Sequence, residues 1–212
     1  MAFLDHYKRA LIVLKRTVDL ESLEGTFIPD VFKERTWTKL LNPMGNVFED
    51  IIREFFANAF VEGDHINCWL RGREFSISRE SIQEVLEICL TTPKTSLQYD
   101  EIKEKLEPLV KVLGGKLKKK ALHTIAFSPE MRVLAYIMVF NLYPVKNLTT
   151  LSRPRTIFLF DLFTHKEIDI CGHIYHLFIK SITKRNSRLT LLFPSLVMSL
   201  ILRARVKILG GL

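Results

Sequence analysis

The feature that most constrains the fold is a recurrence of apolar residues at helical spacing. Between residues 43 and 61 they fall three or four positions apart and form one apolar face, made of Val47, Ile51, Ile52, Phe55, Phe56, Ala59 and Phe60. The same spacing, with capping serines, first-turn prolines and terminating glycines, predicts further helices. These are expected over residues 5–16, 27–37, 78–89, 99–113, 128–142, 153–163, 169–183 and 194–203.

One segment has the pattern of a β-hairpin instead. Two short β-prone runs, residues 66–70 and 74–77, flank Arg71-Gly72-Arg73, whose glycine suits a tight turn. We expect Trp69 to pack against the helix at 43–61. The sequence therefore predicts a mostly α fold: a single helical domain over residues 1–212 with one small β-hairpin at about residues 66–77. Its 48% hydrophobic content is enough for one sizeable core.

Composition indicates an intracellular protein. Cys68, Cys89 and Cys171 are odd in number and widely spaced, unlike the disulfide framework of a small secreted domain. The most apolar stretch, residues 189–202, contains Thr190, Pro194 and Ser195 and is shorter than the roughly 20 residues that span a bilayer. We therefore expect no membrane insertion. The expected location is the nucleus or the cytoplasm, and the sequence does not choose between them.

Charge is distributed unevenly along the chain. Residues 1–107 carry 14 Lys/Arg against 19 Asp/Glu, a net −5, whereas residues 108–212 carry 17 against 4, a net +13. A basic half attracts polyanions, but it could equally attract the acidic half of the same chain or of a partner. If nucleic acid is bound, the expected phosphate contacts are Lys116, Lys118, Lys119, Lys120, Lys180, Lys184, Arg185, Arg188, Arg203, Arg205 and Lys207.

Several short motifs, in order along the chain, resemble a known family. They are Arg53-Glu54-Phe55-Phe56-Ala57-Asn58, Leu70-Arg71-Gly72, Phe75-Ser76, Ser81-Ile82, Ile168-Asp169-Ile170-Cys171-Gly172 and Phe193-Pro194-Ser195-Leu196. Each is weak alone, but their joint order is specific. The chain resembles the family described as "putative plant transposon protein domain" over about residues 17–206. This resemblance implies an origin in a plant transposable element and implies no particular catalytic mechanism.

The chain departs from that family pattern near its end. After Phe-Pro-Ser-Leu the family continues to a Leu-Cys and then to a Gly-Val, whereas this chain has Leu200-Ile201 and Arg205-Val206. Any role of the family's cysteine is therefore not carried over. The change is compatible with a decaying copy of the element.

No catalytic or metal site is predicted. A transposase of the ribonuclease-H type needs three carboxylates around two metal ions, and the basic half offers only Glu130, Asp161, Glu167 and Asp169, none of them after a convincing strand. The pattern Cys171-x-His173-x-x-His176 could contribute to a zinc site only with a distant fourth ligand such as His165 or Cys89. An ordinary helix face explains it better, and no cofactor is expected.

The sequence thus favours a non-enzymatic, transposable-element-derived domain that binds protein or, weakly and without sequence specificity, nucleic acid. Its partners would be phosphate backbones, another protein or a second copy of the chain. Two alternatives stay open at this stage: a catalytic transposase component, and a vestigial element fragment without selected function.

Overall fold

The computed structural model describes residues 7, 10–42, 45–88, 99–118, 121–144, 149–183 and 190–208. Its α-helices are α2 (Ile28–Lys33), α3 (Glu49–Asn58), α4 (Arg79–Leu86), α5 (Leu106–Val112), α6 (Pro129–Ile137), α7 (Arg153–Phe163), α8 (Ile170–Thr183) and α9 (Pro194–Arg203). Short 3₁₀ turns lie at Glu21–Leu23, Thr38–Leu41 and Thr124–Ala126, and the π-helix Met138–Leu142 continues α6.

The strands form three small sheets. The strands are β1 (Leu11–Ile12), β2 (Phe60–Glu62), β3 (His65–Leu70), β4 (Arg73–Ile77), β5 (Lys116–Lys118), β6 (Ala121–His123), β7 (Thr150–Leu151) and β8 (Thr190–Leu191). β1 pairs with β8, β3 lies between β2 and β4, and β6 lies between β5 and β7.

The prediction of a mostly α domain with one hairpin is therefore wrong. Helix accounts for 52% of the described residues, but the eight strands found among them, in three sheets, make the fold mixed α/β. Six of these strands are only two or three residues long, too short to show apolar–polar alternation in a sequence. The segment predicted as a helix at 5–16 is the clearest case. There Leu11 and Ile12 form β1, which runs parallel to Thr190 and Leu191 of β8, about 180 residues away.

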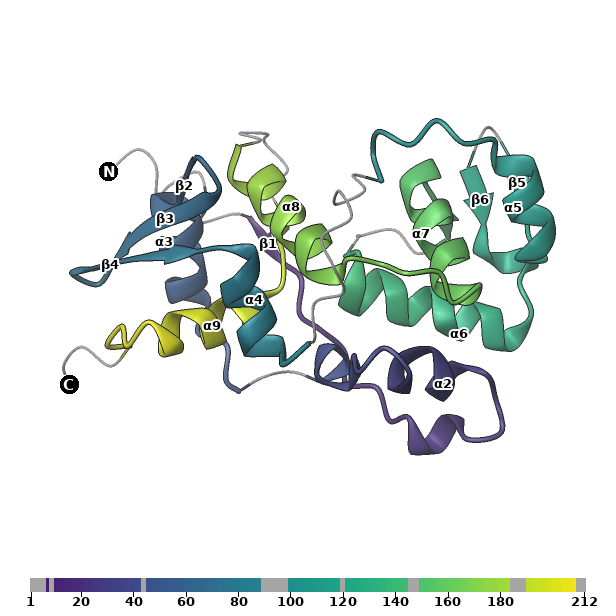
Figure 1. Cartoon of the computed structure of the whole chain (residues 1–212), viewed down its shortest axis with the longest axis horizontal. Helices are drawn as coiled ribbons and strands as arrows, with labels where there is room; N and C mark the ends of the chain where they lie inside the picture. Colours follow the sequence, from purple (N-terminus) through teal and green to yellow (C-terminus); the bar gives the residue numbers. More distant parts are fainter. Residues whose placement is uncertain are drawn as a thin grey trace.

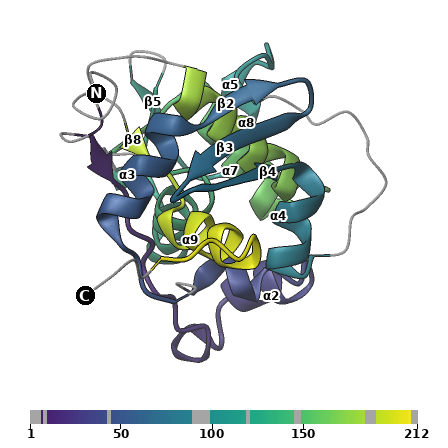
Figure 2. The ribbon, with the colours of Figure 1, turned by 90° about the vertical axis from the view of Figure 1, so that its left-hand side faces the viewer.

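The molecule is elongated, with different elements at its two ends (Figure 1). The sheet β2–β3–β4, with α3, α4 and α9, forms one end, and α5, α6, α7 and the sheet β5–β6–β7 form the other. Helix α8 and the β1–β8 pair lie between them. Viewed from the first end, α3 lies beside the sheet and packs on β3, and α9 packs against both α3 and α4 (Figure 2).

The expected hairpin is confirmed, and β2 extends it to three strands. β3 and β4 are antiparallel, and Leu70 pairs with Arg73 around the two-residue turn Arg71-Gly72. Both turn residues have positive φ (51° and 77°), the geometry of a type I′ turn, which glycine adopts without strain. Helix α3 stops at Asn58, so Phe60 and Val61, which the sequence predicts to be helical, pair with β3 instead.

The predicted packing of Trp69 against the helix is wrong. Side chains of a strand alternate between its two faces, and Ile66, Cys68 and Leu70 occupy the face that packs on α3, each 0% exposed. Trp69 therefore points to the opposite face and is 57% exposed. The sequence located the strand correctly but assigned this aromatic ring to the wrong side.

Helix starts are the best predicted feature. Ser78 caps α4 by accepting a hydrogen bond of 3.3 Å from the N–H of Ser81, and Ser128 accepts one of 3.2 Å from Met131 at the start of α6. α7 and α9 have the expected bounds. The helix expected at 99–113 is shorter, because α5 begins only at Leu106. No helix in the described part of the chain is long and apolar enough to cross a membrane.

Candidate functional site

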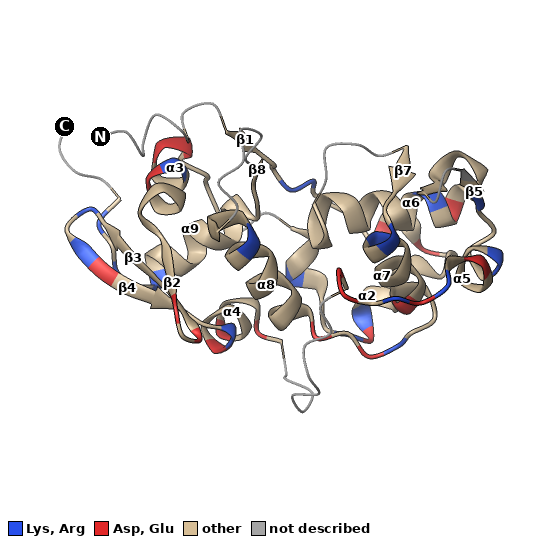
Figure 3. Cartoon of the chain, turned by 90° about the horizontal axis from the view of Figure 1, so that it is seen from above, with Lys and Arg blue, Asp and Glu red and all other residues tan. Residues whose placement is uncertain are grey.

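The predicted phosphate contacts do not form one surface. Lys119, Lys120, Lys184, Arg185 and Arg188 lie outside the described residues, as does the side chain of Lys118. Of the rest, exposed Lys116 on β5 lies at the end of the molecule opposite to Arg203, which ends α9, and to the segment 204–207 that follows it (Figures 1 and 3). The candidates that can be located are therefore divided between distant places.

Two of the predicted cations are already paired with acids of the other half of the chain. Lys180 on α8 forms an ion pair with Asp100, and Arg203 at the end of α9 forms one with Glu84 on α4. Desolvation of the Asp100 carboxyl opposes ionisation, but the bond and charge of Lys180, together with the hydrogen bond from Tyr143, lower the pKa of Asp100 overall. Part of the positive charge of residues 108–212 is therefore neutralised by acids of residues 1–107. This is one of the outcomes that the sequence left open, the attraction of the basic half to the acidic half of the same chain.

A basic cluster that the sequence did not reveal lies at the tip of the β3–β4 hairpin. The guanidinium of Arg73 donates a hydrogen bond of 3.2 Å to the backbone carbonyl of Arg205, which joins the hairpin to the segment after α9. Arg73, Arg205 and Lys207 are exposed, and no described acidic side chain pairs with any of them. We call these three residues the hairpin-tip cluster. Arg205 and Lys207 are among the phosphate contacts predicted from the sequence. Arg73 is not, because it lies 132 residues from Arg205 along the chain.

Two of the four acids that a nuclease would need, Asp161 and Asp169, have structural roles. Asp161 accepts a hydrogen bond of 3.3 Å from the hydroxyl of Tyr99 and lies 3.1 Å from the ammonium of Lys166. Asp169 caps α8 by accepting a bond of 2.9 Å from the N–H of Gly172, and it lies 3.1 Å from the guanidinium of Arg79. Of the other two candidates, Glu130 lies exposed in the first turn of α6.

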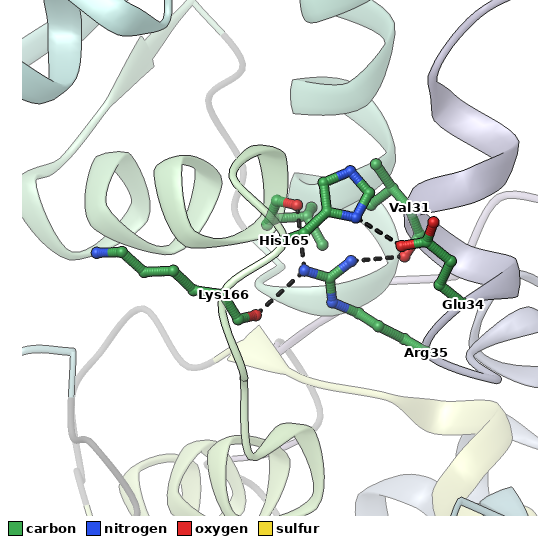
Figure 4. Close-up of polar contacts among 6 residues, drawn as sticks. Val31, Glu34, Arg35, His165 and Lys166 are labelled. Carbon is green, nitrogen blue, oxygen red and sulfur yellow. Dashed lines mark hydrogen bonds and ion pairs between the residues drawn. The ribbon is translucent and has the colours of Figure 1, made fainter.

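The fourth acid, Glu167, lines a cleft of about 390 Å³ between the end of α2 and residues 165–171. Arg35 is the main contact across it: its guanidinium donates to the carbonyls of Val31 (2.9 Å), Leu162 (3.4 Å) and Lys166 (3.1 Å) (Figure 4). Beside it, Nδ1 of His165 lies 2.7 Å from a carboxylate oxygen of Glu34. Carbonyls at the ends of α2 and α7 thus bind Arg35, so this arrangement cross-links two helix ends.

Residues 33–207 match the family described as "Putative plant retrotransposon-related domain". The chain belongs to this family. The match confirms the predicted origin in a plant transposable element. No curated protein and no solved structure matches the chain.

In this retrotransposon-related domain, the histidine and cysteine of the Cys171-x-His173 motif are core residues. The rings of Tyr99, Tyr143 and Phe158 surround His173 with centroids 5.6, 4.5 and 4.8 Å from it. Burial, and next the nearby charge of His176, lowers the pKa of His173 to about 3. Burial raises the pKa of the Cys171 thiol to about 12. No three His, Cys, Asp or Glu side chains gather as a metal-binding group in the part of the chain that the structure describes.

Proposed function

We propose that this retrotransposon-related domain is a non-enzymatic binding domain that contacts nucleic acid weakly and without sequence specificity. The observation that carries the proposal is the hydrogen bond from Arg73 to the carbonyl of Arg205, which brings Arg73 to the exposed segment that contains Arg205 and Lys207. Lysine and arginine side chains bind phosphate oxygens, which fix a protein on a nucleic acid but carry no sequence information.

The size of the cluster sets the expected strength. Three phosphate contacts supply only a modest electrostatic attraction, so we expect dissociation constants in the range typical of non-specific binding, about 1–100 μM at physiological salt. Arg203 and Arg71 lie beside the cluster in the sequence but are paired with Glu84 and Glu54, so they add less. Lys116, at the far end of the molecule, would be a second contact on a long nucleic acid.

The structural roles of Asp161 and Asp169 favour binding over catalysis. Each is already held by a cation and by a hydrogen-bond donor. A catalytic transposase component would need its carboxylates gathered around metal ions. The vestigial alternative predicts no nucleic-acid affinity beyond that of any protein of charge +8.

A charge-matched pair of variants tests the proposal. In the first, Arg73, Arg205 and Lys207 are each replaced by Gln. In the second, three exposed lysines elsewhere, Lys33, Lys103 and Lys111, are replaced by Gln, which removes the same charge. Binding to a labelled duplex at low salt should weaken roughly tenfold or more in the first variant and much less in the second. Equal weakening would mean that only net charge matters, and the proposed site would be wrong.

A further inference from the structure

The outer face of the sheet β2–β3–β4 carries two exposed aromatic rings. Trp69 is 57% exposed and Phe60 is 49% exposed. Phe60 pairs with Asn67, two residues before Trp69 on the same face of β3, so the two rings are diagonal neighbours with backbones about 7–8 Å apart. Large aromatic side chains are normally buried in the core. Two of them exposed together on one face of a sheet indicate an interaction surface.

Carboxylates accompany both rings. Glu74 on β4 lies directly opposite Trp69 in the register, and Glu62 lies two residues after Phe60 on the same face of β2. The Glu62 side chain is oriented by a chain of polar contacts across the three strands. The hydroxyl of Ser76 donates to the amide oxygen of Asn67 (2.6 Å), and the amide nitrogen of Asn67 donates to Glu62 (3.0 Å). One Glu62 oxygen is thus engaged, and the carboxylate is held on the exposed face.

From this arrangement we propose that the outer sheet face binds an extended protein segment bearing lysine or arginine side chains. A cation is attracted to the face of an aromatic ring, most strongly to tryptophan, and a carboxylate beside the ring adds a charged hydrogen-bond acceptor. Trp69 with Glu74, and Phe60 with Glu62, are two such units. An extended segment presents alternate side chains about 7 Å apart, a spacing similar to that of the two rings.

This surface is separate from the hairpin-tip cluster. Paired residues of a sheet share a face, and Arg73 pairs with buried Leu70, so Arg73 leaves the hairpin on the side opposite to Trp69. Glu62 and Glu74 would repel phosphate groups, which excludes a nucleic acid as the preferred occupant of the outer face. The two sides of one hairpin thus differ in charge: carboxylates and aromatic rings on the outer side, arginines on the other.

The test is a titration of the whole chain with a nine-residue peptide that carries lysine at alternate positions, separated by serine. Trp69 itself reports the binding, because the other tryptophan, Trp37, is only 3% exposed. We expect saturable binding at low salt with a change in tryptophan emission. By calorimetry, Trp69→Ala should weaken binding about fivefold, and Glu62→Gln with Glu74→Gln should weaken it further.

Two controls make the outcome decisive. Glu107→Gln, an exposed carboxylate on α5 at the other end of the molecule, should leave the peptide affinity unchanged (Figure 1). A peptide with glutamate in place of lysine should not bind. Absence of binding at low salt, or binding that Trp69→Ala and the double glutamine variant leave intact, would overturn the proposal. The hairpin-tip variant should not bind the peptide more weakly, because it removes only positive charges, so this test is independent of the nucleic-acid proposal.

Discussion

The guanidinium of Arg73 reaches the backbone carbonyl of Arg205 across 3.2 Å and so joins two segments 132 residues apart in the sequence. Arg73→Ala should loosen the segment that follows α9 while leaving global stability nearly unchanged, because the bond is exposed. Hydrogen exchange tests this: the amide of Val206, bonded to the carbonyl of Ile201, should exchange faster in the variant. An unchanged rate would mean that the hairpin does not hold this segment.

The alternation of β3 makes a sharp prediction for two neighbouring residues. Leu70→Ala should lower the free energy of unfolding by about 2–5 kcal/mol, because Leu70 is fully buried against α3. Trp69→Ala should change it by no more than about 0.5 kcal/mol, because the ring is on the exposed face. Urea unfolding of both variants provides the measurement. A loss of several kcal/mol in Trp69→Ala would show that the ring is buried after all.

Arg35 should stabilise the fold by cross-linking the ends of α2 and α7. Its guanidinium binds three backbone carbonyls, of Val31, Leu162 and Lys166, and a lysine could not bridge all three. We expect Arg35→Lys to cost about 1–3 kcal/mol of unfolding free energy. Lys33→Ala, an exposed change on the same helix, is the control and should stay within about 0.5 kcal/mol. Equal effects in the two variants would argue against the cross-link.

His173 should make the fold sensitive to acid. Its pKa falls from the ordinary 6.5 to about 3 in the folded chain, mainly by burial, so the unfolded chain binds the proton more tightly. Stability is therefore greatest above pH 6.5 and is lost as the pH falls toward 3, by about 2 kcal/mol between pH 7 and pH 5. Urea unfolding at both pH values should show this loss, and a His173→Leu variant should show a loss smaller by that amount. Parallel pH dependence in the two proteins would contradict the assignment.

Features of the fold that depend on interactions between residues close in the sequence could be predicted, whereas those that depend on distant residues could not. Ser78 and Ser128 start their helices through bonds to residues three positions ahead, and the Arg71-Gly72 turn joins adjacent strands, so all three could be predicted. β1 could not, because two residues show no period and their partner, β8, lies about 180 residues away. Trp69 was assigned wrongly because apolar character alone does not say which face of a strand is buried.

The candidate sites show the same limit. Arg205 and Lys207 were recognisable as basic residues, but their association with Arg73 follows from tertiary packing of the hairpin on the α9 end. The ion pairs Lys180–Asp100 and Arg203–Glu84 likewise join residues about 80 and 120 positions apart. Counting charged residues along the sequence reveals the charge imbalance between the two halves of the chain. It does not show which cations have no acidic partner in the folded structure.

The measurement that tests the central claim most directly is the salt dependence of duplex binding, made on the unaltered chain and on the triple Gln variant of Arg73, Arg205 and Lys207. Three phosphate contacts predict that the logarithm of the binding constant falls with the logarithm of salt concentration with a slope of about −3. The triple variant should bind more weakly at every salt concentration and with a distinctly shallower slope. A slope that the triple variant leaves unchanged, or tight binding to one sequence that resists salt, would contradict the proposed hairpin-tip site.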